Sequence, residues 1–460
     1  MTLQEAGKYS RLIETFKKRA VALLLKATGS DFGKQWNEIK QIHTPNDLSI
    51  TQEAYLKALL SHAYHKVPYY SKVFKENNVI TGNELKINEF NKIPLLTKTM
   101  LRKQKEAIAA NDYNTRKWYY TSSGGSTGEP VRFIQDQLLK KWVNATLRYY
   151  YEVVVGIDEL GVKKAILWGS ERDIFAGTNG LKAKTINWLQ NARVLNSFRM
   201  TQVDMRNYVK IINSQKPDLI RGYAGSLYEL CTFIEKNNMP IHKPKVVISA
   251  AETLRPDVRQ KIEHVFRTKV YDFYGSRETP AIAGECNNGL IHVFMFQHYL
   301  EVLDAHNMPV KQGETGKIVL TQLHNYSMPL IRYEIGDLAV LGPKKCACGN
   351  PLPTLSKIVG RITDNFIKED GTIIHGEYFT HLFYFKDWLQ TFQVVQEDYK
   401  KIRVVIVLQA GINMSDKIDI ETKIKLVMGQ DCAVIWEFVE EIPKTQNGKY
   451  LYTKSLLHPS

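Results

Sequence analysis

The sequence predicts an α/β protein in two parts: a large domain with a mainly parallel sheet flanked by helices, and a small α+β domain. Three observations support this prediction. The first hundred residues have the apolar spacing of helices, short β-rich segments then alternate with helical ones, and the pattern changes again after about residue 360. A chain of 460 residues is also long for a single core. We therefore expect a large domain over residues 1–360 and a small domain over residues 361–460.

Helices are expected at the start of the chain. The stretch QEAYLKALLSHAYHKV has apolar residues at helical spacing, and Pro68 ends the pattern. An earlier stretch, FKKRAVALLLKATG, predicts a basic helix on the protein surface, with a helix lying on a membrane surface as the alternative. Its apolar run, Ala20 to Leu25, is far too short to span a bilayer.

The middle of the chain predicts strands that alternate with helices. Three β-rich runs are KKAILWG (163–169), PDLIRGY (217–223) and KPKVVISA (243–250), and the helical run SLYELCTFIEKNN follows the second. This alternation is typical of a largely parallel sheet with helices on its faces. In such a sheet, binding loops follow the carboxyl ends of the strands.

The last hundred residues predict a compact α+β unit of ordinary domain size. FQVVQEDYKKIRVVIVL predicts two strands around a polar turn, MSDKIDIETKIKLVMG an amphipathic helix, and AVIWEFVEEIP a further strand.

Composition and charge narrow the class of protein. Hydrophobic residues make up 44% of the chain and charged residues 24%, as in ordinary globular proteins. The formal net charge of +15 attracts anions such as nucleotides, phosphorylated intermediates, acidic glycans, nucleic acid or a membrane surface. No nucleic-acid-binding motif accompanies the charge, so we expect no nucleic-acid partner. An odd count of five cysteines and a polar amino-terminal segment predict a cytoplasmic protein. We expect no transmembrane segment. The oligomeric state stays open.

A loop rich in glycine and hydroxyl groups, YYTSSGGSTGEPVRF (119–133), lies between two strand-like flanks. A flexible linker has a similar composition, but the aromatic flanks and Pro130 favour a tight functional turn. Glycines let backbone N–H groups approach an anion, and the hydroxyls add donors, so phosphate is the expected ligand. The loop is not an ordinary P-loop, because Gly128 is followed by Glu129 instead of Lys.

Further polar segments follow or interrupt strand-like runs. Together with the first loop they offer a phosphate loop, a Glu for a metal, an Asp for a ribose and a mobile Lys, which nucleotidyl transfer requires. The segments are SAAET (249–253), YDFYGSRET (271–279), IRYEIGDL (331–338) with VGRITDNFI (359–367), and PKTQNGKY (443–450).

In order, spacing and sequence, these loops resemble the superfamily of adenylate-forming enzymes, and most closely its phenylacetate–CoA ligase and CapK-like capsule-biosynthesis branch. The resemblance covers most of the chain, since AYHKVPYYSKVF and KIPLLTKTMLR also resemble the start of that branch. It implies a large AMP-binding (adenylation) domain, a small mobile lid domain, and a ligase that uses ATP and Mg²⁺.

The resemblance also implies roles for residues of the phosphate loop and of the loops after the strands. The loop would wrap the β- and γ-phosphates of ATP through Ser123, Gly124, Gly125, Ser126, Thr127 and Gly128. Relatives often have Lys where this chain has Glu129, so one positive contact to the phosphates is missing or comes from elsewhere. The nucleotide and the carboxylate would be framed by Ala250, Ala251, Glu252, Tyr271, Asp272, Phe273, Tyr274, Gly275 and Ser276, while Glu278 would hold Mg²⁺.

The same resemblance implies a ribose contact, a hinge and a catalytic lysine. Asp337 would accept both ribose hydroxyls. Lys449 would enter the active site during adenylation. Gly360 and Arg361 match the hinge signature, with Arg361 counted among the nucleotide-binding residues, but relatives commonly have Asp where this chain has Thr363. The hinge is therefore Arg361, Thr363 or Asp364.

Three cysteines and one histidine form a candidate zinc set. Cys286, His292, Cys346 and Cys348 supply ligands suited to a closed, tetrahedral, structural zinc site. Free cysteines are the alternative, since Cys-x-Cys is a tighter spacing than the common Cys-x2-Cys. Cys231 and Cys432 lie in apolar runs and are expected in the core.

The sequence thus favours an ATP-dependent carboxylate ligase that forms an acyl-adenylate from a carboxylic acid. We expect transfer of the acyl group to CoA, giving a thioester. Transfer to an amine, such as an amino sugar or amino acid in surface-polysaccharide biosynthesis, is the alternative. A nucleotide-binding protein of the same fold without turnover is a further alternative, favoured by Glu129 and Thr363.

Overall fold

The computed structural model describes residues 3–81, 84–122, 131–159, 161–169, 181–359, 366–370, 372–374, 376–383, 386, 388–442 and 452–457. Within these residues, no helix is long and apolar enough to cross a lipid bilayer.

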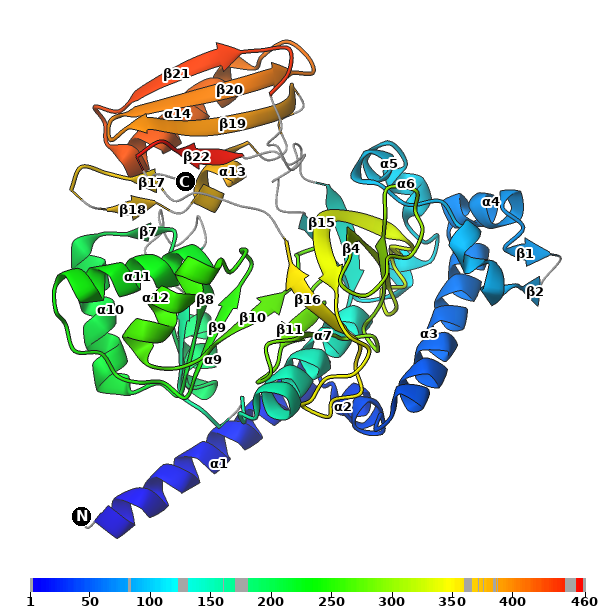
Figure 1. Ribbon diagram of the computed structural model, residues 1–460, viewed down its shortest axis with the longest axis horizontal. Coiled ribbons are helices and arrows are strands. Elements are labelled where there is room, and N and C mark those ends of the chain that lie inside the picture. The colour runs from blue at the N-terminus through cyan, green and yellow to red at the C-terminus, as the bar shows by residue number, and fades with distance from the viewer. Residues whose placement is uncertain are drawn as a thin grey trace.

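The chain begins with helices, as predicted (Figure 1). The third helix begins at a capping box in which Thr44 and Asp47 satisfy each other's backbone N–H groups. It ends at Val67, because the residue before a proline is disfavoured in a helix. The N-terminal elements are α1 (Leu3–Ala27), α2 (Gly33–Lys40), α3 (Pro45–Lys66), α4 (Pro68–Glu76), β1 (Ile80–Thr81), β2 (Glu84–Leu85), η1 (Ile87–Lys92), α5 (Lys98–Lys103), α6 (Lys105–Ile108) and η2 (Tyr113–Thr115).

An antiparallel pair carries the predicted phosphate loop. Strands β3 (Trp118–Ser122) and β4 (Arg132–Asp136) pair from Trp118 opposite Asp136 to Ser122 opposite Arg132. Residues 123–130, which connect them, lie outside the described residues. The Asp136 side chain caps α7 (Gln137–Tyr149), which continues into the π-helical turn η3 (Tyr150–Val155).

One sheet of eleven strands forms the body of the large domain, and its two halves differ in direction. The parallel half has the order β6-β5-β8-β9-β10, and from β10 onward the order β11-β12-β16-β15-β14-β13 is antiparallel. The strands are β5 (Lys164–Leu167), β6 (Ala192–Leu195), β8 (Leu219–Tyr223), β9 (Val246–Ala250), β10 (Val270–Tyr274), β11 (Ala283–Glu285), β12 (Ile291–Val293), β13 (His298–Leu303), β14 (Thr315–Gln322), β15 (Tyr333–Leu341) and β16 (Thr354–Ile358).

The α/β class and the three β-rich runs are confirmed, since β5, β8 and β9 lie within them. Helices cover the parallel half, and their buried residues share a core with β8, β9 and β10. The helices of this region are α9 (Leu181–Leu189), α10 (Gln202–Gln215), α11 (Ala224–Lys236) and α12 (Pro256–Phe266), with the short strand β7 (Arg199–Met200).

The C-terminal α+β unit has the predicted hairpin, helix and strand. Its sheet has the order β21-β20-β19-β22. Strand β18 pairs with β7 of the large domain, and Phe198 and Tyr223 join the hydrophobic core of the small unit. The elements are β17 (Phe366–Ile367), β18 (Ile373–Ile374), α13 (Gly376–Leu382), β19 (Leu389–Asp398), β20 (Lys401–Leu408), α14 (Met414–Met428), β21 (Ala433–Phe438) and β22 (Thr453–Ser455). The domain boundary at residues 360 and 361 stays a prediction.

Close packing fixes the point where the sheet changes direction. Gly284 of β11 lies opposite Phe273 of β10, and a Cβ atom on Gly284 would lie 2.3 Å from the ring of Tyr150. Tyr150 is fully buried against Phe273 and Phe294. The π-helical turn is therefore pressed directly onto the backbone of β11.

We predict that Gly284→Ala lowers the free energy of unfolding by about 1–3 kcal/mol, because Tyr150 must move to admit the methyl group. The matched control is Gly411→Ala, since no atom lies within 4 Å of a Cβ there. Urea unfolding of both variants measures the difference. Equal stability of the two variants would contradict the tight packing of Tyr150 on β11.

Candidate functional site

Three parallel strands end together at one edge of the sheet. Tyr223 of β8 lies beside Ala250 of β9, and Ala250 lies beside Phe273 of β10. The predicted segments 249–253 and 271–279 therefore leave the sheet at the same edge, as binding loops do in parallel sheets. Ala251 has a φ of 69°, a left-handed conformation that is costly for a residue other than glycine.

Glu252 has a structural contact at this edge. Its carboxylate accepts a hydrogen bond of 2.7 Å from the backbone N–H of Gly225, in the first turn of α11. A negative charge is favourable there, because the N-terminal N–H groups of a helix carry partial positive charge. Glu252 thus fixes the loop after β9 to α11, and its expected contact with adenine stays a prediction.

The predicted nucleotide-binding residues of β10 lie in different surroundings. Tyr271 and Phe273 are buried in one core cluster, whereas Tyr274 packs against another. Asp272 lies beside Glu285, and burial, followed by the charge of Glu285, raises the pKa of Asp272 to about 7. Of these four side chains, Tyr274 is the one that contacts Asp337, the residue predicted to bind the ribose.

A hydrogen bond joins Tyr274 to Asp337. The Tyr274 hydroxyl donates to a carboxylate oxygen of Asp337 at 2.8 Å. Their strands, β10 and β15, are four positions apart in the sheet order, which corresponds to roughly 19 Å in a flat sheet at about 4.8 Å per strand. The sheet must therefore curl strongly to bring the two residues together.

A bulge in β15 positions Asp337. Between the pairs Lys317↔Leu338 and Val319↔Glu334, strand β15 has two more residues than β14. Gly336 lies within this bulge with a φ of 90°, a conformation that favours glycine. Bulges redirect side chains beside active sites, and Asp337 lies within this one. The glycine in the segment IRYEIGDL thus has a geometric reason.

Glu278 lies on a rigid loop beyond β10 and is only 3% exposed. Its backbone carbonyl accepts hydrogen bonds from the side-chain amides of Gln135 at 3.2 Å and Gln322 at 3.1 Å. Glu278 lies within a turn that Ser276 and Thr279 close through mutual hydrogen bonds. Since Gln135 belongs to β4, the strand that leads out of the phosphate loop, that strand lies beside Glu278.

The Glu278 carboxylate has a basic neighbour that sequence analysis did not single out. The Lys98 ammonium lies 3.9 Å away, and both side chains are largely buried. Lys98 begins α5, where a cation is unfavourable for the helix dipole. A lysine at the start of a predicted helix is the sequence feature from which a functional role of Lys98 could have been predicted. The carboxylate oxygens of Glu278 are the kind of ligand that a hard cation such as Mg²⁺ prefers.

The four predicted zinc ligands come together. The ligand atoms of Cys286, His292, Cys346 and Cys348 all lie within 4.8 Å of one another. The Cys286 and Cys346 sulfurs are 3.7 Å apart, too far for a disulfide but close to the value of about 3.8 Å for two thiolates on a tetrahedral zinc. The Cys348 sulfur lies 3.2 Å from Nε2 of His292.

Secondary contacts orient the histidine for a metal. Nδ1 of His292 lies 3.1 Å from the Leu352 carbonyl, so Nδ1 donates and Nε2 keeps its lone pair toward the sulfurs. Burial lowers the pKa of His292, which favours the neutral imidazole that metals bind. Cys286 follows β11, which runs antiparallel to β10, so the cluster lies away from the carboxyl end of β10. This position suits a structural metal.

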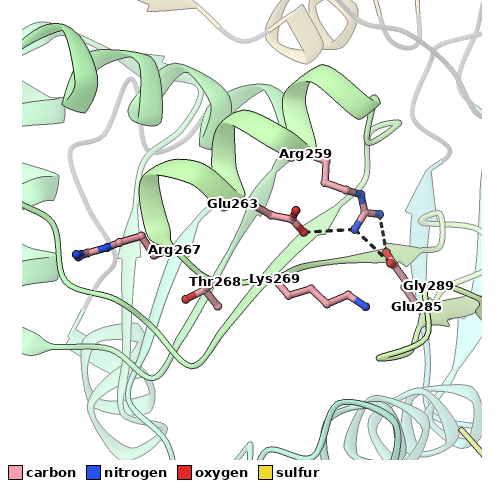
Figure 2. A pocket seen from close by; sticks show the side chains of 7 residues that line it. All are labelled: Arg259, Glu263, Arg267, Thr268, Lys269, Glu285 and Gly289. Carbon is pink, nitrogen blue, oxygen red and sulfur yellow. Dashed lines mark hydrogen bonds and ion pairs between the residues drawn. The ribbon is translucent and has the colours of Figure 1, made fainter.

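A cleft of about 740 Å³ lies at the amino ends of β9 and β10, opposite the candidate site (Figure 2). Arg259 points toward Glu285 and forms two hydrogen bonds with it, at 3.2 and 2.6 Å. Lys269 donates to the carbonyls of Cys286 and Asn287, beside the cysteine cluster. These contacts fasten the amino end of β10 to the turn between β11 and β12.

Some predicted residues cannot be placed. Those of the phosphate loop, the hinge and the catalytic lysine lie outside the described residues, namely Ser123, Gly124, Gly125, Ser126, Thr127, Gly128, Glu129, Gly360, Arg361, Thr363, Asp364 and Lys449.

Known proteins resemble this chain along most of its length. The CapK C-terminal domain family matches residues 366–455. Protein CapK of Staphylococcus aureus is 25% identical over 453 residues, covering 93% of this chain and 95% of CapK. Phenylacetate-coenzyme A ligase of Thermus thermophilus is 25% identical over 341 residues, and that of Pseudomonas putida is 26% identical over 332 residues. They cover 70% and 68% of this chain, and 72% and 70% of the relatives.

Solved structures share the fold. 2-Hydroxyisobutyryl-CoA ligase, in complex with 2-HIB-AMP and CoA in the thioesterification state, aligns with a TM-score of 0.58 and 17% identity over 89% of this chain and 91% of that chain. These matches confirm the predicted resemblance to the superfamily of adenylate-forming enzymes, and within it to the branch of CapK and phenylacetate–CoA ligase. The expectation of an AMP-forming ligase agrees with the coenzyme A ligases among the relatives.

We predict that the purified protein contains about one zinc ion per chain. Four protein ligands complete the tetrahedral coordination of zinc and leave no open position for water, so the ion should be retained during purification. Replacing Cys346 and Cys348 together by serine should remove the metal. Cys432→Ser serves as control, since Cys432 lies in the hydrophobic core of the small unit and is not one of the four clustered residues. Elemental analysis after gel filtration measures the content. Undiminished zinc in the double variant would exclude these two thiols as ligands.

Proposed function

We propose that this protein is an ATP-dependent carboxylate ligase that forms an acyl-adenylate and transfers the acyl group to a second nucleophile. The observation that carries the proposal is the gathering of Asp337 and Glu278 around β10, each held by a contact between distant segments. One carboxylate faces a tyrosine hydroxyl and the other a lysine ammonium. The match to ligases along most of the chain supports the same assignment.

In the first half-reaction, a carboxylate oxygen of the acid attacks the α-phosphorus of ATP. A phosphorus–oxygen bond forms, the bond to the oxygen that bridges the α- and β-phosphates breaks, and pyrophosphate leaves with that electron pair. We assign Asp337 to the ribose hydroxyls and the loop Ser123–Gly128 to the β- and γ-phosphates. Mg²⁺, held by Glu278, would neutralise charge on the phosphate oxygens.

Lys98 is our candidate for the positive contact that Glu129 does not supply. Its ammonium lies 3.9 Å from the carboxylate proposed to hold the metal, so phosphates bound there would lie within its reach. We assign Lys449 to the incoming carboxylate and the α-phosphate, where an ammonium stabilises the charge that develops in the transition state.

In the second half-reaction, the acceptor attacks the acyl carbon and AMP leaves. We propose CoA as acceptor, giving a thioester, because several relatives are coenzyme A ligases and a chain of net charge +15 suits the phosphates of CoA. Transfer to an amine is the alternative that the resemblance to the CapK-like branch allows. CapK matches over 453 residues and the phenylacetate ligase over 341, so this chain extends beyond its similarity to the thioester-forming relative.

We predict carboxylate-dependent exchange of labelled pyrophosphate into ATP, measured with the full-length protein over a broad panel of acids. Lys449→Ala should lower this exchange at least about a hundredfold, a conservative value for the loss of one transition-state donor. Transfer from a supplied acyl-adenylate should stay largely intact, because the lysine has no task after the adenylate forms. Lys454→Ala, in the exposed part of β22, is the control.

Three outcomes would overturn parts of the proposal. An absence of exchange with every acid, despite measured ATP binding, would favour a nucleotide-binding protein without turnover. Equal loss of both half-reactions in Lys449→Ala, with unchanged folding and ATP affinity, would contradict a separate adenylation role. The acceptor is tested by supplying CoA and amines to the same acyl-adenylate. Acylation of an amine without consumption of CoA would exclude the thioester.

A further inference from the structure

The amino-terminal end of helix α1 projects from the body of the protein (Figure 1). The carboxyl-terminal half of α1 lies against the large domain and keeps apolar side chains in solvent. Phe16 is 61% exposed and Leu23 is 68% exposed. They are seven residues apart, almost two turns of helix, so they lie on the same face. This apolar face is not used by the proposed ligase reaction.

The rotation of α1 is fixed by contacts on its other faces. The Lys17 ammonium donates to the side-chain carbonyl of Asn191 at 2.6 Å and lies over the ring of Trp188. Lys18 forms an ion pair of 2.6 Å with Asp158, and Val21 is buried. Phe16 and Leu23 are therefore held outward by the docking of α1 on the large domain.

Basic side chains flank the apolar face. Arg19 and Lys26 are exposed and are also seven residues apart, so they form a parallel row beside Phe16 and Leu23. Neither has an ion-pair partner among the described residues. Residues 15–28 contain no Asp or Glu, so this part of the helix carries positive charge only.

We propose that the outer face of α1 docks this protein on an anionic lipid surface. Apolar side chains beside a row of cations match the boundary between acyl chains and acidic headgroups, where the apolar groups insert and the cations attract the lipid charge. The helix would lie in the plane of the surface.

A second copy of the chain is the less favoured occupant of this face. Pairing two such helices would bring Arg19 and Lys26 of each copy near one another without an acidic residue in this stretch to compensate. Like charges across an interface are strongly unfavourable. Acidic headgroups attract these cations, whereas a second copy would repel them. The positive charge therefore favours a lipid surface over a second copy of the chain.

The test is co-sedimentation of the full-length protein with vesicles of equal parts phosphatidylcholine and phosphatidylglycerol, and with phosphatidylcholine alone. We expect binding to the anionic vesicles and little to the neutral ones. The double variant Phe16→Glu with Leu23→Glu should need at least about tenfold more lipid for half-binding, since two exposed apolar side chains no longer insert. The measurement does not depend on ligase activity.

A matched control keeps the change in charge equal. Ile50→Glu with Val203→Glu alters two other exposed apolar residues, on α3 and α10, and should bind like the unmodified protein. Exchange of Phe16 and Leu23 for serine tests the apolar contribution without added charge. Circular dichroism shows that each variant is folded.

Three results would overturn the proposal. The first is no binding of the unmodified protein to anionic vesicles. The second is equal loss of binding in the control pair, which would leave only non-specific attraction of a basic protein. The third is a dimer in light scattering that the Phe16 and Leu23 variant dissociates, which would assign the face to a second copy of the chain.

Discussion

The hydrogen bond between Tyr274 and Asp337 sets a constraint on which the candidate site depends. It joins the last residue of the parallel half of the sheet to a bulge in the antiparallel half. A flat sheet cannot satisfy it, so the antiparallel strands must curl back over the carboxyl end of β10. The same curl allows Gln322 of β14 to reach the carbonyl of Glu278. One geometric condition thus brings Asp337 and Glu278, the carboxylates proposed for the ribose and the metal, to the carboxyl end of β10.

The opposite end of β10 is fixed by different chemistry. Arg259 holds Glu285, Lys269 holds the turn after β11, and the cluster of Cys286, His292, Cys346 and Cys348 gathers two loops that are about sixty residues apart in the chain. A metal there would cross-link the point where the sheet changes direction. We infer that this end supports the sheet while the carboxyl end provides the chemistry.

Much of this arrangement could be predicted from residue patterns. The α/β class, the strands of the parallel half, the small α+β unit and the four clustered ligands follow from periodicity, from turn residues and from ligand chemistry. The resemblance to adenylate-forming enzymes was predicted from the order and sequence of the polar loops, and CapK matches over 93% of this chain. These features could be predicted because they depend on residues that are close together in the sequence, or on residue types that few other functions require.

The remainder depends on contacts between segments distant in sequence, which no local pattern encodes. The antiparallel half, the pairing of β7 with β18, and the approach of Lys98 to Glu278 are all of this kind. A motif can also suggest a role while the structure shows a different contact. Glu252 was assigned to the nucleotide by its motif, but its carboxylate binds a backbone N–H group in the first turn of α11. Its neighbours Tyr271 and Phe273 lie in the core, because alternate residues of a buried strand face opposite sides.

The most direct test of a nucleotide site at Asp337 is the ratio of the dissociation constants of ATP and 2′,3′-dideoxy-ATP, measured by calorimetry. If Asp337 accepts the ribose hydroxyls, ATP should bind at least about tenfold more tightly, since hydrogen bonds to a charged group contribute about 1.5–3 kcal/mol. In Asp337→Ala, the two nucleotides should bind alike. Equal affinities in the unmodified protein would contradict the ribose contact, and with it the placement of the nucleotide at the carboxyl edge of β10.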